Sequence, residues 1–463
     1  MVRSACTRVI LPYVFGFVIV VVSTSTAIAM DSWKAGAAKV VITPSQLMWM
    51  SGYGSRDHAA EGKLHDLWAK ALVIEDPTGE RLLLITLDLV GIDRQLSLAV
   101  RDELAEQHKL EKRQVAICCS HTHTGPVVGR NLRAMYFLDE AQTKLVDSYT
   151  DELQAKILAV AGDAISKLAP AELSWANAKA TFAVNRRTNV EADVPRLISE
   201  GALKGPVDHD APVLGVRDKQ GELKAIVCGY ACHATVLSFF QWSGDWPGFA
   251  QIELEKAHPG AIALFWAGCG ADQNPLPRRD VTLAEKYGRE LATAVDQALA
   301  GKMTPITGQI AASYAEIDLP LATLPTTEEL QKQAESKDKF FASRAKLLLA
   351  QIAGGKPLSQ TYPYPVQCWR LGNGPTWITL GGEVVVDFSL RIKQELGADR
   401  TWVAGYTNDV MAYIPSRRVL NEGGYEGASA MVYYGLPTTW APEVEERIVN
   451  EVKRQATEVR AAK

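Results

Sequence analysis

Two histidines separated by one residue follow an apolar run and are the clearest candidates for chemistry in the chain. The run 114–119 predicts a short buried strand, and Ser-His-Thr-His-Thr-Gly-Pro follows it at 120–126. If the chain stays extended, His121 and His123 lie on the same side, because side-chain direction alternates along a strand. Two adjacent imidazoles suit a zinc site, or one metal ligand beside one acid–base group. The alternative interpretation is two polar residues that cap a strand.

Four more polar or ionisable side chains occupy equivalent positions elsewhere in the chain. Each follows a short apolar run that predicts a strand; they are His233, Asp272, Glu383 and Asn408. In α/β proteins, ligands and catalytic groups gather beyond the C-terminal ends of strands. Together with His121, these residues therefore predict one shared metal or catalytic site.

The spacing of apolar residues predicts the elements that position this site. Strands are expected at 38–43, 67–75, 81–89, 171–187, 214–216, 225–232, 261–267, 377–380 and 402–406. Helices are expected at 96–110, 141–167, 247–258, 284–299, 384–396 and about 443–462. The stretch 326–353 predicts a long surface helix or a helical hairpin. No internal repeat is present, and a single α/β domain fits best.

Composition and the N-terminus limit the class of protein. The 463 residues are 47% hydrophobic and 22% charged, which is typical of a globular protein, and the net charge of −4 gives no reason to expect nucleic acid as a partner. Two arginines, an apolar run at 9–22 and small residues up to Ala29 predict a signal peptide over residues 1–29. The mature protein, 30–463, is then secreted or periplasmic. No later stretch is long and apolar enough to span a bilayer.

Six cysteines remain after removal of the predicted signal peptide. They lie mostly in or next to apolar runs, so buried thiols and disulfides are both compatible with the sequence. A bridge such as Cys119–Cys232 or Cys118–Cys269 is conceivable in an oxidising compartment, and the sequence does not decide between these alternatives.

Four short motifs, in the same order along the chain, resemble the neutral (non-lysosomal) ceramidase family. They are Ser-His-Thr-His-Thr-Gly-Pro at 120–126, Cys-His-Ala-Thr at 232–235, Gly-Glu at 382–383 and Tyr-Glu-Gly-Ala-Ser at 425–429. Members of that family are secreted or surface zinc amidases that cleave the N-acyl bond of ceramide. The resemblance covers roughly residues 35–440. It implies mixed β-sheets with flanking helices, as in the family's catalytic domain, with the site at the C-terminal ends of strands.

The resemblance implies a zinc site with one ion per chain. The family's ligands fall on His121, His233, Glu383 and Tyr413. Two imidazoles, a carboxylate and a phenolate suit Zn²⁺, which would lower the pKa of a bound water to about 7 and supply hydroxide. Each residue also has a structural interpretation: a core histidine, a carboxylate at a helix N-terminus, or a tyrosine that only packs.

The same resemblance places catalytic groups around the substrate amide. His123 would pass a proton to the leaving amine, and Arg186 and Tyr425 would donate hydrogen bonds to the carbonyl oxygen. Asp245 would orient a ligand histidine or cap the helix that Pro247 begins.

Two departures from the family pattern bear on the substrate. The family loop Gly-Asp-Val-Ser-Pro-Asn carries a serine considered essential, whereas residues 270–275 read Gly-Ala-Asp-Gln-Asn-Pro. Gln273 or Asn274 takes the place of the serine, which excludes a serine nucleophile and leaves Asp272 as a candidate general base. A second metal near Asp272 stays an open question. The chain also ends in a charged helix where the family continues into an immunoglobulin-like domain.

These residues lead us to expect a secreted zinc hydrolase of an N-acyl amide, either ceramide or a related N-acylated small molecule or lipid. Two alternatives stay open. One is a non-catalytic zinc-containing binding protein, which the missing serine favours. The other is an esterase or lactonase that uses the same site. A hydrolase with a serine–histidine–aspartate triad is disfavoured because the chain has no Gly-x-Ser-x-Gly turn.

Overall fold

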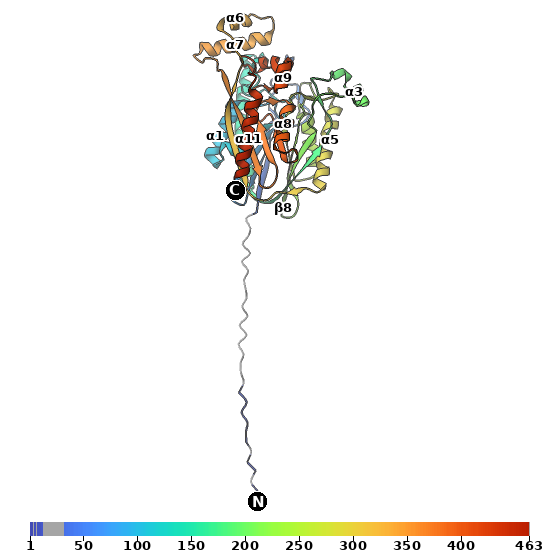
Figure 1. Ribbon diagram of the computed structural model, residues 1–463, viewed down its shortest axis with the longest axis vertical. Helices are drawn as coiled ribbons and strands as arrows, with labels where there is room; N and C mark the ends of the chain where they lie inside the picture. The colour runs from blue at the N-terminus through green and yellow to red at the C-terminus, as the bar shows by residue number, and fades with distance from the viewer. Residues whose placement is uncertain (3, 6, 13–31, 463) are drawn as a thin grey trace. The chain divides into compact units, whose positions relative to one another are not determined.

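The computed structural model describes residues 1–2, 4–5, 7–12 and 32–462 (Figure 1). The predicted cleavage site near Ala29, and most of the predicted signal peptide, lie outside these residues. The part from 32 onward forms one compact unit. Among the described residues, none of the helices combines the length and the hydropathy that a membrane crossing requires.

The larger of two main β-sheets contains most of the strands that the sequence predicts. Its strand order is β11-β9-β8-β6-β1-β3-β4-β5, with β13 (Thr304–Pro305) paired to β6. Neighbours are antiparallel except for the parallel pairs β11–β9 and β4–β5. The bounds are β1 (Lys34–Val41), β3 (Trp68–Glu75), β4 (Arg81–Leu87), β5 (Val115–Cys119), β6 (Ala169–Lys179), β8 (Asp210–Asp218), β9 (Leu223–Tyr230) and β11 (Ile262–Ala267).

One face of this sheet packs against helices. Alternate strand residues such as Leu83, Ile85 and Ile117 join one apolar cluster with residues of these helices. The helices are α1 (Arg94–His108), α2 (Glu140–Ser166), α4 (Asp245–Ala257) and α5 (Val281–Ala300). Because every second residue of a strand faces the same way, the intervening residues, such as Leu82 and Leu84, face the other side.

The second sheet covers that other side. It has the order β14-β15-β16-β18, and it is antiparallel except for the parallel pair β16–β18. The strands are β14 (Ile310–Pro320), β15 (Thr361–Leu371), β16 (Thr376–Leu380) and β18 (Thr401–Ala404). A row of buried tryptophans fills the space between the two sheets: Trp266, Trp369, Trp377 and Trp402.

Helices α8 (Val386–Leu396) and α11 (Val444–Ala461) close the outer face of the second sheet. Figure 1 shows α11 in red, lying along this sheet. Apolar side chains such as Phe388, Ile448 and Val452 form a core there with Val366 and Ile378. The mixed α/β fold with flanking helices is therefore confirmed.

Of the two alternatives predicted for the stretch 326–353, the helical hairpin is confirmed. It consists of α6 (Thr327–Ala334) and α7 (Lys339–Ala353), because Asp338 caps a second helix through Phe340 N–H. Two details differ from the sequence-based expectation. The predicted strand 171–187 is divided into β6 and β7 (Ala183–Asn185). Strands β14 and β15 were not anticipated, since the half-exposed pattern of β14 and the two prolines of β15 hide the strand signal.

The six cysteines from Cys118 onward are all buried free thiols. Packing against apolar side chains accounts for them without disulfides.

Candidate metal centre

His121 lies two residues beyond β5, where the chain turns out of the sheet. Its φ of 61° shows that the extended conformation does not persist past the strand, contrary to the simple alternation expected from sequence. The ring Nδ1 lies 2.6 Å from the carbonyl oxygen of Val90. Because a carbonyl oxygen only accepts hydrogen bonds, Nδ1 carries a hydrogen and is engaged outside the site, which leaves Nε2 facing it. The side chain therefore offers Nε2 as a metal ligand.

His233 is oriented in the same way from the far side of the site. It follows β9 by three residues, and its Nδ1 lies 2.8 Å from the carbonyl oxygen of Gly270. Its backbone is fixed by Trp246, whose indole N–H donates to the His233 carbonyl oxygen at 2.8 Å. Burial lowers the pKa of His233 to about 4, so the imidazole is neutral, as a metal ligand must be.

Glu383 completes this group at the start of β17 (Glu383–Val384), which pairs in parallel with β19 (Tyr413–Ile414). Its Oε2 lies 3.1 Å from His121 Nε2 and 3.2 Å from His233 Nε2. Its Oε1 accepts a hydrogen bond from the Tyr434 hydroxyl. Burial opposes the charge on Glu383, but the neighbouring imidazoles hold its pKa well below the usual range. The carboxylate is therefore ionised, with Oε2 directed at the two ligand nitrogens.

His123 lies beside the other two imidazoles. Its Nε2 is 3.1 Å from His121 Nε2, and the nitrogen atoms offered by His121, His123 and His233 all lie within 4.8 Å of one another. Burial holds the pKa of His123 well below its usual range. Gly52 permits this packing, because a Cβ there would lie 2.5 Å from the His123 ring and the backbone has a φ of +98°.

Tyr413 and Arg186 extend the site on the side of His233. The Tyr413 hydroxyl lies 3.3 Å from His233 Nε2, and Arg186 Nη2 donates to that hydroxyl at 3.2 Å. Burial holds the pKa of the Tyr413 phenol well above its usual range. A nearby cation would oppose this effect by favouring the phenolate.

Tyr425 stands where the site meets solvent. Its ring centroid is 5.3 Å from that of Tyr413, and the Arg186 guanidinium carbon lies 5.6 Å from the Tyr425 ring centroid. Tyr425 is 41% exposed, whereas Tyr413 is only 3% exposed. The buried group of ligands is therefore bordered by a partly exposed tyrosine.

The donor set fits a divalent zinc-like ion. Three imidazoles, one carboxylate and one phenol converge, and Glu383 Oε2 is a buried oxygen without a hydrogen bond from any described residue. An uncompensated carboxylate oxygen among imidazole lone pairs is costly, and a cation relieves both groups at once. Nitrogen and oxygen ligands of this kind suit Zn²⁺.

The loop after β11 distinguishes Gln273 from Asn274, which the sequence left equivalent. Gln273 is buried in the backbone framework: its Oε1 accepts from Asp208 N–H at 3.0 Å, and its Nε2 donates to the Ala231 carbonyl. Asn274 points the other way, and its Oδ1 accepts from Arg186 Nη1 at 3.2 Å. Asn274 is therefore the loop residue that faces the site.

Asp272 is fully buried, and both of its carboxylate oxygens accept hydrogen bonds. Oδ1 accepts from Val386 N–H, at the first turn of α8, at 2.8 Å, and Oδ2 accepts from Asn185 Nδ2 at 3.1 Å. Its backbone oxygen accepts from Arg186 N–H at 2.8 Å. Burial raises its pKa to about 6. In this arrangement Asp272 holds the framework of Arg186, and a role as general base stays a prediction.

Asn408 and Asp245 also serve the framework. Asn408 Oδ1 accepts from Ile117 N–H at 3.0 Å, and so joins the loop after β18 to β5. Asp245 accepts from the N–H groups of Val236, Leu237 and Trp246, and the residue that precedes α4 as its N-cap is Gly244. Asp245 thus orders the chain after His233 without a hydrogen bond to that ring.

Sequence reasoning missed two residues of the site. Tyr434 contacts Glu383 from 51 positions along the chain, and Glu426 Oε1 accepts from Arg186 Nε at 2.7 Å. Glu426 stands beside Tyr425 in the Tyr-Glu-Gly-Ala-Ser motif, which could have indicated it. Nothing in the local sequence marks Tyr434.

Comparisons with known proteins show that this chain is similar to ceramidases. The family model described as "Neutral/alkaline non-lysosomal ceramidase, N-terminal" matches residues 33–342. A neutral ceramidase of Pseudomonas aeruginosa is 25% identical over 247 residues, which span 50% of this chain and only 35% of that relative.

Two solved structures share the fold. One, described as a ceramidase complexed with C2, has a TM-score of 0.71 at 19% identity and is covered over 75% of its length. The other, a neutral ceramidase from Pseudomonas aeruginosa, has a TM-score of 0.70 at 20% identity and is covered over 74%. Both matches include 93% of this chain.

Proposed function

Since the chain belongs to the neutral/alkaline non-lysosomal ceramidase family, we propose that it is a zinc-dependent hydrolase of an N-acyl amide bond. The observation that carries this proposal is the orientation of His121 and His233. Both rings use Nδ1 on a backbone carbonyl and turn Nε2 toward the same oxygen of Glu383. Such an arrangement is typical of a metal centre whose ligands are held by their outer contacts.

The ligands of the single zinc ion are His121, His233, Glu383 and Tyr413. When bound, zinc would act as a Lewis acid and would lower the pKa of a bound water to about 7, so that hydroxide becomes available at neutral pH. Every protein group that would hold it is already placed by a backbone or side-chain contact.

The remaining side chains act on the amide itself. Hydrolysis joins a water oxygen to the carbonyl carbon, breaks the C–N bond and delivers a proton to the leaving nitrogen. Arg186 and Tyr425 donate hydrogen bonds to the carbonyl oxygen as negative charge develops on it. His123 is neutral and buried beside the ligands, so it can take a proton from water and pass it to the nitrogen.

The loop 270–275 supplies no nucleophile. Asn274 holds Arg186, and an amide side chain cannot form an acyl intermediate. The reaction therefore proceeds by direct attack of water.

The substrate is ceramide or a related N-acylated compound. Residues 30–463 form one catalytic domain, and residues 1–29 are a signal peptide that directs the protein to the periplasm or outside the cell. Family membership and the amide-directed donors Arg186 and Tyr425 support this assignment.

Activity assays on metal-analysed protein test the proposal. Zinc-loaded protein is incubated with a short-chain N-acyl sphingosine, an N-acyl amino acid, an N-acyl sugar and matched esters, with and without a chelator. We expect about one zinc per chain, amide cleavage that the chelator abolishes, and loss of both zinc and activity in His121→Ala.

Two other results would replace the proposal. Full zinc occupancy without cleavage of any substrate would indicate a binding protein. Cleavage of esters alone would indicate an esterase or lactonase.

A further inference from the structure

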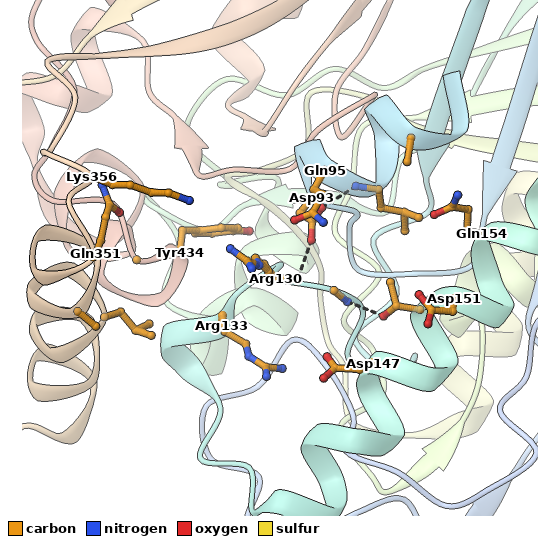
Figure 2. Close-up of a pocket in the computed structure, with 18 residues that line it drawn as sticks. Asp93, Gln95, Arg130, Arg133, Asp147, Asp151, Gln154, Gln351, Lys356 and Tyr434 are labelled. Atoms are coloured by element: carbon orange, nitrogen blue, oxygen red, sulfur yellow. Dashed lines mark hydrogen bonds between the residues drawn. The ribbon is translucent and has the colours of Figure 1, made fainter. Parts of the chain in front are cut away.

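A second cavity lies outside the group of metal ligands, between α1, α2, the loop 129–133 and the end of α7. It has a volume of about 1010 Å³. Figure 2 shows Arg130, Lys356 and Tyr434 directed into the same space, with Arg133 below them. We propose that this cavity binds a small anion, a carboxylate or phosphate group, between Arg130 and Lys356.

The basic side chains of this cavity make no direct ion pair, although Asp93, Asp147 and Asp151 line the same cavity. Arg130, Arg133 and Lys356 form no ion pair with any described residue, and Arg133 Nη1 is a buried donor without a partner among the same residues. Other surface arginines, such as Arg391 and Arg454, are each paired with carboxylates. An anion between Arg130 and Lys356 would therefore meet two cations that no protein carboxylate already pairs with.

The loop that carries Arg130 is fixed before any ligand binds. Arg130 N–H donates to Asp93 Oδ2 at 2.5 Å, and Gly129 N–H donates to Thr150 Oγ1 at 2.9 Å. Gly129 has a φ of +52°, and a Cβ there would lie 2.3 Å from Asp93 Oδ2. The backbone of the loop is thus tied to both α1 and α2, so binding of an anion would have to order only the side chains.

Acidic residues determine where the anion lies. Asp93 is already engaged with the backbone at the start of α1. Asp147 and Asp151 project from α2 and would repel an anion from that wall. The side near Lys356 and Tyr434 is therefore the favourable one.

Part of the lining suits an apolar tail. Leu96 and Ala99 of α1 and Leu347 and Ala350 of α7 line the same cavity. A carboxylate or phosphate with a short hydrocarbon chain would bury that chain there and so bind more tightly than the bare anion.

Calorimetric titration of the full-length protein tests this site. Octanoate, acetate and inorganic phosphate are titrated at low ionic strength into zinc-loaded protein and into chelator-treated protein. Chelator-treated protein carries no zinc, so anion binding to it is separate from anion binding at the metal. A failure of the anion site can therefore be distinguished from a failure of the proposed hydrolase. We expect one octanoate per chain in both forms, and weaker binding of acetate.

Variants locate the bound anion. Arg130→Gln and Lys356→Gln are expected to weaken binding about tenfold each, which corresponds to the loss of one charged hydrogen bond. Lys346→Gln, on helix α7 shortly before Lys356 but outside the cavity lining, is the matched control and should bind as the parent does. Both altered side chains in the test variants lack ion pairs, so the fold should be retained.

The outcomes are distinct. Phosphate binding that depends on Arg130 and Lys356, with no gain from the octanoate chain, supports the anion site and identifies free phosphate as the ligand chemistry. Octanoate binding tighter than phosphate identifies an amphiphilic carboxylate. Absence of binding to chelator-treated protein, or equal effects of Lys346→Gln and Lys356→Gln, overturns the proposal.

Discussion

The Tyr434 hydroxyl donates to Oε1 of Glu383, while Oε2 of the same carboxylate faces Nε2 of His121 and Nε2 of His233. Tyr434 therefore fixes the rotation of the carboxylate. Contacts of this kind set which oxygen of a ligand meets the metal.

Tyr434→Phe should weaken zinc binding by about 10- to 100-fold, because Glu383 would lose the contact that orients it. Competition with a fluorescent zinc chelator measures this affinity. Tyr433→Phe is the control, since the neighbouring hydroxyl makes no contact with Glu383. Equal zinc affinities of Tyr434→Phe and the parent would contradict the role.

Glu426→Gln should lower kcat/KM by about 10- to 100-fold and leave zinc content unchanged. The carboxylate of Glu426 accepts from Arg186 Nε at 2.7 Å and from Arg187 Nη1 at 2.6 Å, and its side chain is only 4% exposed. Its loss would free the guanidinium from the position proposed for the carbonyl oxygen.

The control for this variant is Glu422→Gln. Glu422 also pairs with Arg187, but its side chain is 45% exposed and does not contact Arg186. A solvent-exposed ion pair of this kind contributes little to the stability of the fold. If both variants lose the same activity, the effect does not depend on Arg186.

Gln273→Ala and Asn274→Ala should separate stability from activity. Loss of Gln273 leaves the Asp208 N–H and the Ala231 carbonyl buried without partners, which costs about 1–3 kcal/mol for each group. Loss of Asn274 removes one contact to Arg186 and should reduce turnover with little change in unfolding. Urea unfolding and kcat/KM, measured on both variants, check this division. If Gln273→Ala mainly lowers turnover and Asn274→Ala mainly lowers stability, the roles given to these two residues are wrong.

Asp409→Asn should stabilise the protein at alkaline pH. Burial raises the pKa of Asp409 from 3.8 to about 7, and the Tyr362 hydroxyl donates to its Oδ2 at 2.7 Å. A raised pKa in the folded state means that the folded protein holds the proton more tightly. The stabilisation is complete below about pH 4 and is lost as the pH rises through 7.

The asparagine variant does not lose a proton over this range. Its advantage in free energy of unfolding should therefore grow from pH 4 to pH 8, toward roughly 4 kcal/mol. Urea unfolding at several pH values measures the difference. Asp399→Asn is the control, because Asp399 is exposed and its charge is solvated in both states. A constant difference across the pH range would show that Asp409 does not titrate as proposed.

Local patterns of the sequence were sufficient for most elements of the fold. Two apolar runs separated by Pro77-Thr78-Gly79 predicted β3 and β4. Helical spacing predicted α1, α2 and α5, because side-chain burial repeats about every 3.6 residues in a helix. They failed for β14 and β15, whose stability depends on pairing with each other and on the cover from α11. A short stretch of sequence carries no information about these distant partners.

For the site, the sequence by itself determined the residue types and the positions of His121, His233 and Glu383 beyond strand ends. Only the tertiary structure decided which ring nitrogen each histidine offers, that Asn274 rather than Gln273 faces Arg186, and that Tyr434 and Glu426 belong to the site. The physical reason is that hydrogen bonds between distant segments set side-chain orientation. Sequence spacing carries information only about neighbours along the chain.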